Sequence, residues 1–307
     1  MYDIAVIIIN YNSSQFTINA IDSIVKTTSK DLNYQIIVID NASKYEDFLS
    51  LQKEIKDTPN LELVRSRINT GFGAGNMLGV QFTNAKYYAF VNNDTLLLND
   101  CLSVLKLFME SNLKVALCAP QGYDENKNVL HSFDHFLTLR RELFGRSIFE
   151  LLYPKTYPKR NIVYNDPIKV QCIPGSFLFV DSTIFNTVGG FDTNIFLYYE
   201  ETDLAYRMNQ LKEKNECYLV PSAKFIHFIG KSTPPSLLIK KELKISLLYV
   251  LKKNSSYLSY LILRSYLTIT YTIKSLVKPR YFKLAILLLK GAPLSDSLKQ
   301  SQIILNK

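Results

Sequence analysis

Short apolar runs alternate with helical patterns through the first hundred residues, and this alternation restricts the fold more than any other feature. IAVIII, YQIIVID, LELV and YYAFVNND each have the length and composition of a buried strand. Between the first two runs, apolar residues recur at helical spacing from Phe16 to Val25. Strands that alternate with helices predict parallel βαβ units and therefore an α/β protein.

Polar residues close these apolar runs. In open α/β sheets, ligands bind beyond the carboxyl ends of the strands. The residues that this rule places along one sheet edge are Asn10, Tyr11, Asp40, Asn41, Asn93 and Asp94. We therefore expect the functional site at that edge.

Residues 115–230 read as a continuation of the same domain. KVALCAP, VQCIPGSFLFV and CYLVPSAKFIHF predict short strands, with helices from about residue 182 and over about residues 200–214. Residues 125–165 are polar, aromatic and interrupted by prolines, and the sequence assigns them no structure. We expect an excursion there that is mobile or faces an acceptor.

Charge divides the 307-residue chain unevenly. From residue 231 onward, 14 basic residues stand against two acids, Glu242 and Asp296, which leaves a net charge of +12. The preceding residues hold 22 basic and 25 acidic side chains, a net charge of −3. This asymmetry predicts that the last part of the chain contacts an anionic surface, either membrane lipid or nucleic acid.

The same last part has a different character from the rest of the chain. It is rich in Leu, Ile, Tyr and Lys at helical spacing, so we divide the chain into a main domain, 1–232, and a basic amphipathic helical extension, 233–307. Arg264 and Lys274 interrupt the best candidate for a membrane span, which favours helices that lie in the membrane interface. A helical cap that only covers the main domain is the alternative.

Two further features concern the compartment. Four cysteines, at positions 101, 118, 172 and 217, lack the spacing of a zinc ribbon or a disulfide framework, which favours a reducing, cytosolic environment. The chain begins without a basic region, and its first apolar run is only about six residues long, so we expect no secretory signal.

Asp94 and His227 have the chemistry to bind a divalent cation, since hard oxygen and imidazole ligands hold the cations used in diphosphate chemistry. Asp94 follows an apolar strand, where its carboxylate can face a ligand or simply cap a turn or helix. His227 lies in KFIHFIG, where a core histidine bonded to a backbone carbonyl is the alternative. Spacing alone decides neither case.

Seven motifs in order resemble family 2 glycosyltransferases with the GT-A fold, and most of all the rhamnosyltransferase-like members. They are VIIINYN, VIDNAS, NTGFGAGNMLG, FVNND, PGSFLFVDSTIFNTVGGFD, FLYYEETDLAYR and IHFIGKS, and they cover about residues 4–232. Each motif is weak alone, but seven in register are a strong signal. The resemblance implies an α/β, Rossmann-like nucleotide-diphospho-sugar transferase fold, followed here by the helical extension.

The resemblance also implies a donor site. Asn10 and Tyr11 look like the nucleotide-binding turn, and Asp40 matches the carboxylate that binds the pyrimidine base. An aspartate can accept a hydrogen bond from the imide N–H of uracil or thymine; a cap for the following turn is the alternative for Asp40. Asn69 and Asn76 match polar positions of NTGFGAGNMLG, whose small residues would let the backbone approach a sugar nucleotide.

GFGAGN also resembles a dinucleotide-binding fingerprint. It does not follow the first strand, however, and Asn76 stands where the last glycine belongs, so we set that function aside. Family members often have a basic residue at the position of Gly75. Arg65 and Arg67 are therefore the remaining candidates for phosphate contacts.

Asn92, Asn93 and Asp94 match the metal-binding DxD motif of the family in a reduced form. Asp94 would bind Mn²⁺ or Mg²⁺ together with the diphosphate, Asn93 would contact the sugar nucleotide, and His227 matches a late metal-ligand position. The metal would stabilise the negative charge on the departing nucleoside diphosphate.

FLYYEETDL implies the catalytic group. Glu201 stands at the position of the general base, where many members have Asp, and the longer side chain is tolerable if the backbone compensates. Glu200, Asp203 and Gly175 are assigned to the acceptor site, with Asp203 also expected at a helix start beside Arg207. A run of acids favoured by the helix dipole is the alternative.

These features predict an inverting glycosyltransferase. It would move a sugar, for which rhamnose is a candidate, from a dTDP- or UDP-sugar to a hydroxyl of a saccharide in bacterial cell-surface polysaccharide synthesis. The acceptor would be lipid-linked, and the protein cytoplasmic and peripheral on the inner face of the plasma membrane.

Three other functions are alternatives to this one. A sugar nucleotidyltransferase would need a glycine-rich basic loop after the first strand, where NYNSSQF stands. A catalytically inactive protein that binds glycan or nucleotide sugar as a scaffold would tolerate loss of Asp94, Glu201 or His227, which are all present. Nucleic-acid binding through the tail, which we do not expect, predicts salt-sensitive retention on DNA.

Overall fold

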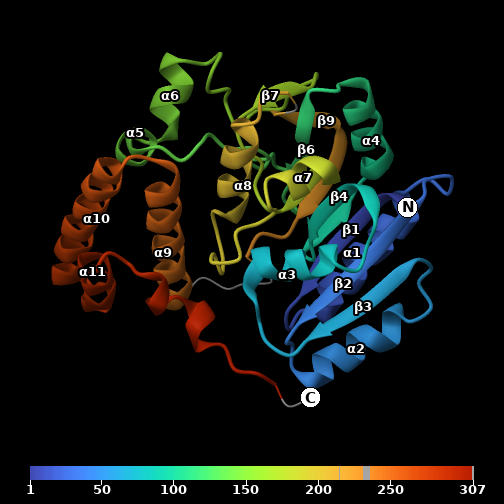
Figure 1. Cartoon of the computed structure of the whole chain (residues 1–307), viewed down its shortest axis with the longest axis horizontal. Coiled ribbons are helices and arrows are strands. Elements are labelled where there is room, and N and C mark those ends of the chain that lie inside the picture. The colour runs from blue at the N-terminus through green and yellow to red at the C-terminus, as the bar shows by residue number, and fades with distance from the viewer. Residues whose placement is uncertain (214, 231–235, 306–307) are drawn as a thin grey trace.

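The computed structural model describes residues 1–213, 215–230 and 236–305. It confirms the expected α/β class, because the described residues form one nine-stranded sheet with helices on both faces (Figure 1). The expected boundary between residues 232 and 233 lies outside the described residues.

The sheet has the order β3-β2-β1-β4-β8-β6-β9-β5, and β7 pairs with β9. Its strands are β1 (Tyr2–Asn10), β2 (Tyr34–Asn41), β3 (Leu61–Ser66), β4 (Ala85–Asn92), β5 (Thr95–Leu97), β6 (Val115–Tyr123), β7 (Ile168–Val170), β8 (Phe177–Asp181) and β9 (Glu216–His227). The parallel pairing of β1 with β2 and β4, and of β2 with β3, confirms the predicted βαβ units. β8 is antiparallel to both of its neighbours, β4 and β6.

The helices that precede β9 are α1 (Ser14–Thr27), α2 (Tyr45–Ile55), α3 (Gly71–Val80), α4 (Cys101–Ser111), α5 (Leu139–Phe144), α6 (Arg146–Leu152), α7 (Ser182–Thr187) and α8 (Glu200–Asn209). Those that follow are α9 (Leu237–Asn254), α10 (Tyr257–Val277) and α11 (Phe282–Leu289), with the 3₁₀ turns η1 (Pro279–Tyr281), η2 (Leu294–Asp296) and η3 (Leu298–Ser301). Both helices predicted between residues 182 and 214 exist, but α8 ends earlier than expected.

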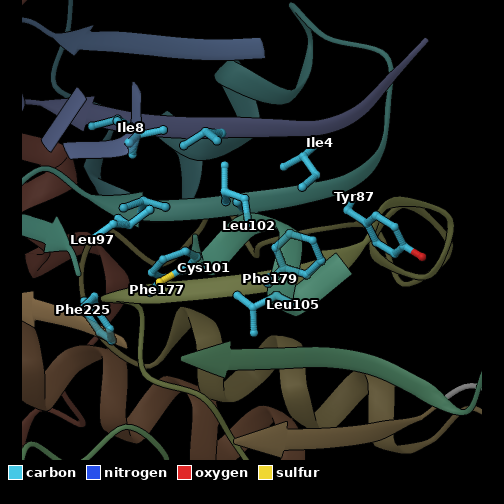
Figure 2. Packing of buried hydrophobic residues seen from close by; sticks show 14 of the residues in the cluster. Ile4, Ile8, Tyr87, Leu97, Cys101, Leu102, Leu105, Phe177, Phe179 and Phe225 are labelled. Carbon is cyan, nitrogen blue, oxygen red and sulfur yellow. The ribbon is translucent and has the colours of Figure 1, made fainter. Parts of the chain in front are cut away.

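Alternate residues of β1 enter two different cores, because successive side chains of a strand point to opposite faces of its sheet. Ile4 and Ile8 pack with residues of α1, α2 and α4, and Figure 2 labels Leu102 and Leu105 of α4 among the side chains of this core. Ala5 and Ile7 pack on the other face with residues of α7 and α8. A fully buried isoleucine contributes about 1.5–3 kcal/mol, so this alternation fixes the register of the central strand.

Glycines in α3 allow that helix to lie directly on β1. A Cβ atom at Gly75 would come within 2.8 Å of the Cδ1 atom of Ile9, and one at Gly79 within 2.6 Å of the Cγ2 atom of Ile7. At these two positions the small residues of NTGFGAGNMLG therefore permit helix–sheet packing. This differs from the expectation that they let the backbone approach a sugar nucleotide.

Residues 125–165, which the sequence left unassigned, fold around the carboxylate of Asp134. That carboxylate accepts hydrogen bonds from Arg146 at 2.7 and 2.8 Å and lies 3.4 Å from the guanidinium groups of Arg141 and Arg160. Burial by itself would raise the pKa of Asp134, but Arg146 and Arg141 outweigh it and lower that pKa. Charged contacts thus hold the parts of this excursion together.

Helices α9, α10 and α11 form a core of their own beside α8 (Figure 1). Leu137 of the excursion and Ile195, just before α8, join this core and connect the helices to the sheet domain. Within the described ranges, no helix combines the length and the hydropathy needed to cross a membrane.

Candidate active site

The pairing of β5 with β9 brings Asp94 and His227 together. The two strands are antiparallel with Thr95 opposite His227, and the amide of Phe228 donates to the carbonyl of Asp94 at 2.9 Å. As a result, the Nε2 atom of His227 lies 3.2 Å from the Oδ1 atom of Asp94. The fold thus unites the two residues that the sequence singled out as metal ligands.

This pair fits a divalent cation. Two ligands at about 2.1 Å from one ion and at right angles to each other lie about 3 Å apart, close to the distance between Asp94 and His227. The described part of the chain contains no cluster of three or more His, Cys, Asp or Glu residues arranged for a metal. The remaining ligands would therefore come from a diphosphate, as is common for Mg²⁺.

Beside this pair lies a pocket of about 420 Å³, here called the glutamate pocket. Four residues predicted for the site line it, namely Gly175, Glu200, Glu201 and His227. A Cβ atom at Gly175 would lie 3.2 Å from the ring of Phe72, which is a tight contact. The first turn of α8 thus presents its two glutamates to the pocket.

Burial controls the ionisation of both glutamates. It raises the pKa of Glu201 to about 7. Burial, reinforced by the neighbouring charge of Glu201, also holds the pKa of Glu200 well above its ordinary range. Glu200 is 3% exposed, and its Oε2 atom has no hydrogen-bond partner among the described residues. The pocket thus holds two neighbouring carboxyl groups whose pKa values are both raised by burial, that of Glu201 to about 7.

Two tyrosines in a strained conformation precede these glutamates. Tyr198 and Tyr199 have φ angles of 73° and 68°, in the left-handed region that side chains other than glycine rarely adopt. Such strain costs about 1–3 kcal/mol per residue and persists where the surrounding structure imposes it, often at functional sites. Here it turns the chain sharply into α8, so that Glu200 and Glu201 begin the helix at the pocket wall.

A second pocket, of about 290 Å³, adjoins the first and is here called the asparagine pocket. Its amide-bearing wall comprises Asn41, Asn69, Asn92 and Asn93, and Tyr11 also lines it. The two pockets share Phe72, Asn92 and Leu197. A ligand with two linked parts can therefore occupy both.

Hydrogen bonds within the protein orient the asparagines of this pocket. The side chain of Asn41 donates to that of Asn69 at 3.1 Å and accepts from the amide of Thr70 at 3.0 Å. Asn93 donates to the hydroxyl groups of Ser13 at 2.7 Å and Thr17 at 3.0 Å. Their side chains are thus fixed independently of a ligand.

Asn10 and Asp40 line neither pocket, and both side chains are fully buried. The Nδ2 atom of Asn10 lies 3.0 Å from Asp40, 3.1 Å from Ser43 and 3.0 Å from Asp47. Burial would raise the pKa of Asp47, but the hydrogen bonds from Asn10 and Ser14 outweigh it and lower that pKa. Hydrogen bonds of Asn10 and Asp40 therefore connect the end of β1 to the loop after β2, outside the lining of both pockets.

Asn76 and Asp203 also lie away from the pockets. The side chain of Asn76 donates to the carbonyl of Phe72 within α3. Asp203 is fully buried and accepts from Lys253 at 3.0 Å and Asn254 at 2.9 Å, so it fastens α8 to α9. The expected pair of Asp203 with Arg207 is confirmed at 2.9 Å.

The two arginines considered for phosphate contacts have other partners. The guanidinium group of Arg65 stacks 4.2 Å from the ring centroid of Phe48 and donates to the carbonyl of Ser43. Arg67 donates to the carbonyl of Leu305 at 3.0 Å. Neither arginine lines the asparagine or the glutamate pocket.

Sequence reasoning missed several residues of the glutamate pocket. His131 and Ser132 come from the unassigned excursion, where no periodicity marks them. Tyr198 stands in FLYYEETDL directly before the glutamates, so its place in a motif was a usable signal. Burial and the charge of Arg160 lower the pKa of His131, which keeps this histidine neutral at physiological pH.

Comparison with known proteins decides the family. The model described as glycosyl transferase family 2 matches residues 5–185, more than half of the chain. The chain belongs to glycosyl transferase family 2. The resemblance found in its motifs is thereby confirmed.

Two curated relatives of this glycosyltransferase are rhamnosyltransferases. Rhamnosyltransferase WbbL of Escherichia coli (strain K12) is 28% identical over 207 residues, which cover 64% of this chain and 74% of WbbL. The dTDP-rhamnosyl transferase RfbF of Shigella flexneri is 22% identical over 240 residues, covering 74% of this chain and 70% of RfbF. The chain is therefore rhamnosyltransferase-like.

Solved structures confirm the GT-A fold. The crystal structure of GalNAc-T7 with UDP, GalNAc and Mn²⁺ superposes with a TM-score of 0.60 at 14% identity, over 82% of this glycosyltransferase and 48% of that chain. The structure of S. aureus TarS 1-349 in complex with UDP gives a TM-score of 0.53 at 14% identity, over 83% and 67% of the two chains. This glycosyltransferase thus spans about half of the GalNAc-T7 chain that it matches.

Proposed function

We propose that this family 2 enzyme transfers a sugar from a nucleoside diphosphate to a hydroxyl of a saccharide, with inversion at the anomeric carbon. One observation supports this proposal above all. The two pockets share Asn92, which lies close in sequence to Asp94, the partner of His227. One pocket offers oriented amides to a nucleotide, and the other offers a carboxyl group that titrates near neutrality. A nucleotide sugar that spans both pockets presents its diphosphate at their junction.

Glu201 is the proposed general base. A group with a pKa of about 7 is ionised often enough to accept a proton and is still basic enough to hold it. The carboxylate takes the proton of the acceptor hydroxyl as that oxygen attacks the anomeric carbon, and the bond from this carbon to the diphosphate breaks on the opposite side. Glu200, protonated under the same conditions, can donate a hydrogen bond that orients the acceptor.

Asp94 and His227 would hold Mn²⁺ or Mg²⁺ together with the diphosphate. A bound divalent cation would supply positive charge where the leaving group becomes negative. Of the matched structures, the GalNAc-T7 crystal contains UDP and Mn²⁺, which supports a cation of this type for the present enzyme.

The donor we propose is a dTDP- or UDP-sugar. A dTDP-rhamnosyl transferase among the relatives supports dTDP-rhamnose, and the UDP complexes among the matched structures support a pyrimidine nucleotide. The lining of the asparagine pocket by Tyr11 and several amides suits a base with hydrogen-bonding edges. In bacteria, such a transfer to a saccharide would serve cell-surface polysaccharide synthesis.

Release of free UDP or dTDP from a panel of sugar nucleotides tests the proposal. We expect turnover of one donor with Mn²⁺ or Mg²⁺, its loss in EDTA, and its loss in Asp94→Ala. Asp57→Ala is the matched control, because the Asp57 side chain is 89% exposed. If no donor turns over and calorimetry detects no donor binding, the proposal fails in favour of a scaffold role.

The proposed acceptor is lipid-linked, and its support is an exposed apolar face on α10 and α11. This face comprises Leu258, Ile262, Tyr266, Ile269, Ile273, Leu276 and Val277 on α10 and Phe282, Ile286 and Leu289 on α11. Their spacing of three or four residues places them along one side of each helix. With the net charge of +12 from residue 231 onward, such a face suits the surface of an anionic membrane on the cytoplasmic side.

Cosedimentation with vesicles of equal parts phosphatidylglycerol and phosphatidylcholine at physiological salt tests the membrane contact. Ile269→Glu places a charge on the apolar face, and we expect it to weaken the binding to vesicles about tenfold. Leu113→Glu is the control, since Leu113 is 78% exposed at the end of α4, outside the helical extension. Absence of binding by the unaltered protein would contradict this part of the proposal.

A further inference from the structure

The chain returns to the sheet domain after α11. Residues 293–305, here called the C-terminal segment, run from the helical extension toward α2 and β3 (Figure 1). Two of its residues, Leu298 and Gln302, line the asparagine pocket together with Tyr11, Asn41 and Asn69. No motif of the sequence pointed to a pocket contact in this segment.

One end of the segment is fastened to α9. The carboxylate of Glu242 accepts hydrogen bonds from the Ser297 hydroxyl and from the amide of Leu298, both at 2.8 Å. Glu242 is 1% exposed and Ser297 is 4% exposed. Hydrogen bonds to a buried charged group contribute about 1.5–3 kcal/mol, so the position of Leu298 is well determined.

The other end is fastened to the loop after β3. The amide of Leu305 donates to the carbonyl of Arg67 at 2.7 Å, and the Nε atom of Arg67 donates to the carbonyl of Leu305 at 3.0 Å. Between the two ends, Lys299 donates to the carbonyl of Thr193. The segment is thus held on both sides of the pocket wall that it forms.

We infer that Leu298 and Gln302 contact the nucleoside of the bound sugar nucleotide and set the affinity for the donor. This inference rests on the proposed function. Both residues line the asparagine pocket but not the glutamate pocket, where the general base lies. They therefore face the part of the donor farthest from the reacting sugar, which is the nucleoside.

The chemistry of the two side chains fits this part of the donor. Leu298 offers an apolar surface to a ribose or a base. The amide of Gln302 donates one hydrogen bond, at 2.8 Å, to the carbonyl of Leu298. A glutamine amide has a second N–H and a carbonyl oxygen, and these can pair with the polar edge of a pyrimidine.

A purely structural role for the segment makes a different prediction. If the segment only stabilised the fold, substitutions along it would lower the melting temperature without a selective effect on the donor. If Gln302 contacts the donor equally in the ground state and the transition state, its loss raises KM for the donor and leaves kcat unchanged. Gln300 provides the matched control, because it belongs to the same segment but is exposed and lines neither pocket.

Calorimetric binding of UDP and dTDP to the full chain, with Gln302→Ala and Gln300→Ala, tests the inference. Gln302→Ala should weaken binding about three- to tenfold, the effect of one lost hydrogen bond. Gln300→Ala should bind as the unaltered protein does, and both variants should keep its melting temperature.

Three outcomes would overturn the inference, and they differ in whether they also contradict the proposed function. Equal affinity in all three proteins, or equal weakening in both variants, would contradict the contact between Gln302 and the nucleoside. Neither result would contradict the proposed function. Failure of the unaltered protein to bind either nucleotide would remove the proposed function itself.

Discussion

The two adjoining pockets differ in how their polar side chains are hydrogen-bonded. In the asparagine pocket, amides such as Asn41 and Asn93 are bonded to neighbouring side chains and backbone. In the glutamate pocket, Glu200 has a buried oxygen without a hydrogen-bond partner among the described residues, and the preceding Tyr198 and Tyr199 are strained. A binding surface gains from groups fixed in advance, whereas a catalytic group needs a pKa shifted from its ordinary value.

Among the substitutions in the glutamate pocket, we expect Glu201→Gln to have the largest effect, which is a loss of activity. The amide cannot accept the acceptor's proton, so kcat should fall by about 10²- to 10⁴-fold. Binding of UDP should stay unchanged, because Glu201 does not line the asparagine pocket. Glu201→Asp, which keeps the carboxylate, should retain more activity than Glu201→Gln. Steady-state kinetics and calorimetry check these results, and an unchanged kcat in Glu201→Gln would contradict the assignment.

Asn10→Ala tests the hydrogen-bond network that joins the ends of β1 and β2, next to the asparagine pocket but outside its lining. It removes the side chain that joins Asp40, Ser43 and Asp47 and takes one hydrogen bond from each of them. We expect a loss of about 1–3 kcal/mol in the free energy of unfolding, measured in urea. Asn19→Ala, at an exposed site on α1, is the control and should change stability little. Equal stability of both variants would show that this network is not structural.

Glu200→Gln tests the buried carboxyl group of the glutamate pocket. This group lowers the free energy of unfolding by an amount that depends on pH. In the unfolded chain Glu200 ionises at its ordinary pKa, while in the folded state its pKa is well above that value. The folded state therefore loses stability as the pH rises above the ordinary pKa of a glutamate. At pH 8 we expect Glu200→Gln to be more stable than the unaltered protein by about 1–3 kcal/mol, and at pH 5 by much less.

Urea unfolding at the two pH values checks this prediction. Glu54→Gln on α2 is the matched control, since Glu54 is exposed and should show no such dependence on pH. A Glu200→Gln variant that is less stable at pH 8 would mean that the buried carboxyl group is satisfied in solution.

The sequence predicted those parts of the fold that local periodicity determines. The parallel strands β1 to β4, and the sheet edge that carries Tyr11 and Asn93, follow from apolar runs and their polar ends. The family motifs added Gly175, Glu200 and Glu201, and the structure brings all three to one pocket.

Local sequence patterns did not predict the contacts between distant parts of the chain. Asp203 was expected near the acceptor, but it is bonded to Lys253 and Asn254 of α9, partners that no motif marks. The antiparallel insertion of β8 between β4 and β6, and the return of Leu298 to the asparagine pocket, likewise depend on tertiary packing. Fixed spacing in a sequence does not encode such pairings.

The pH dependence of kcat/KM at saturating metal tests the central claim, that Glu201 acts as the general base, most directly. With a pKa raised by burial to about 7, the carboxyl group loses its basic form below that pH. We predict that kcat/KM rises about tenfold per pH unit up to about pH 7 and then levels off, and that the residual rate of Glu201→Gln lacks this rise. A flat profile from pH 5 to 8, or the same rise in Glu201→Gln, would contradict the account.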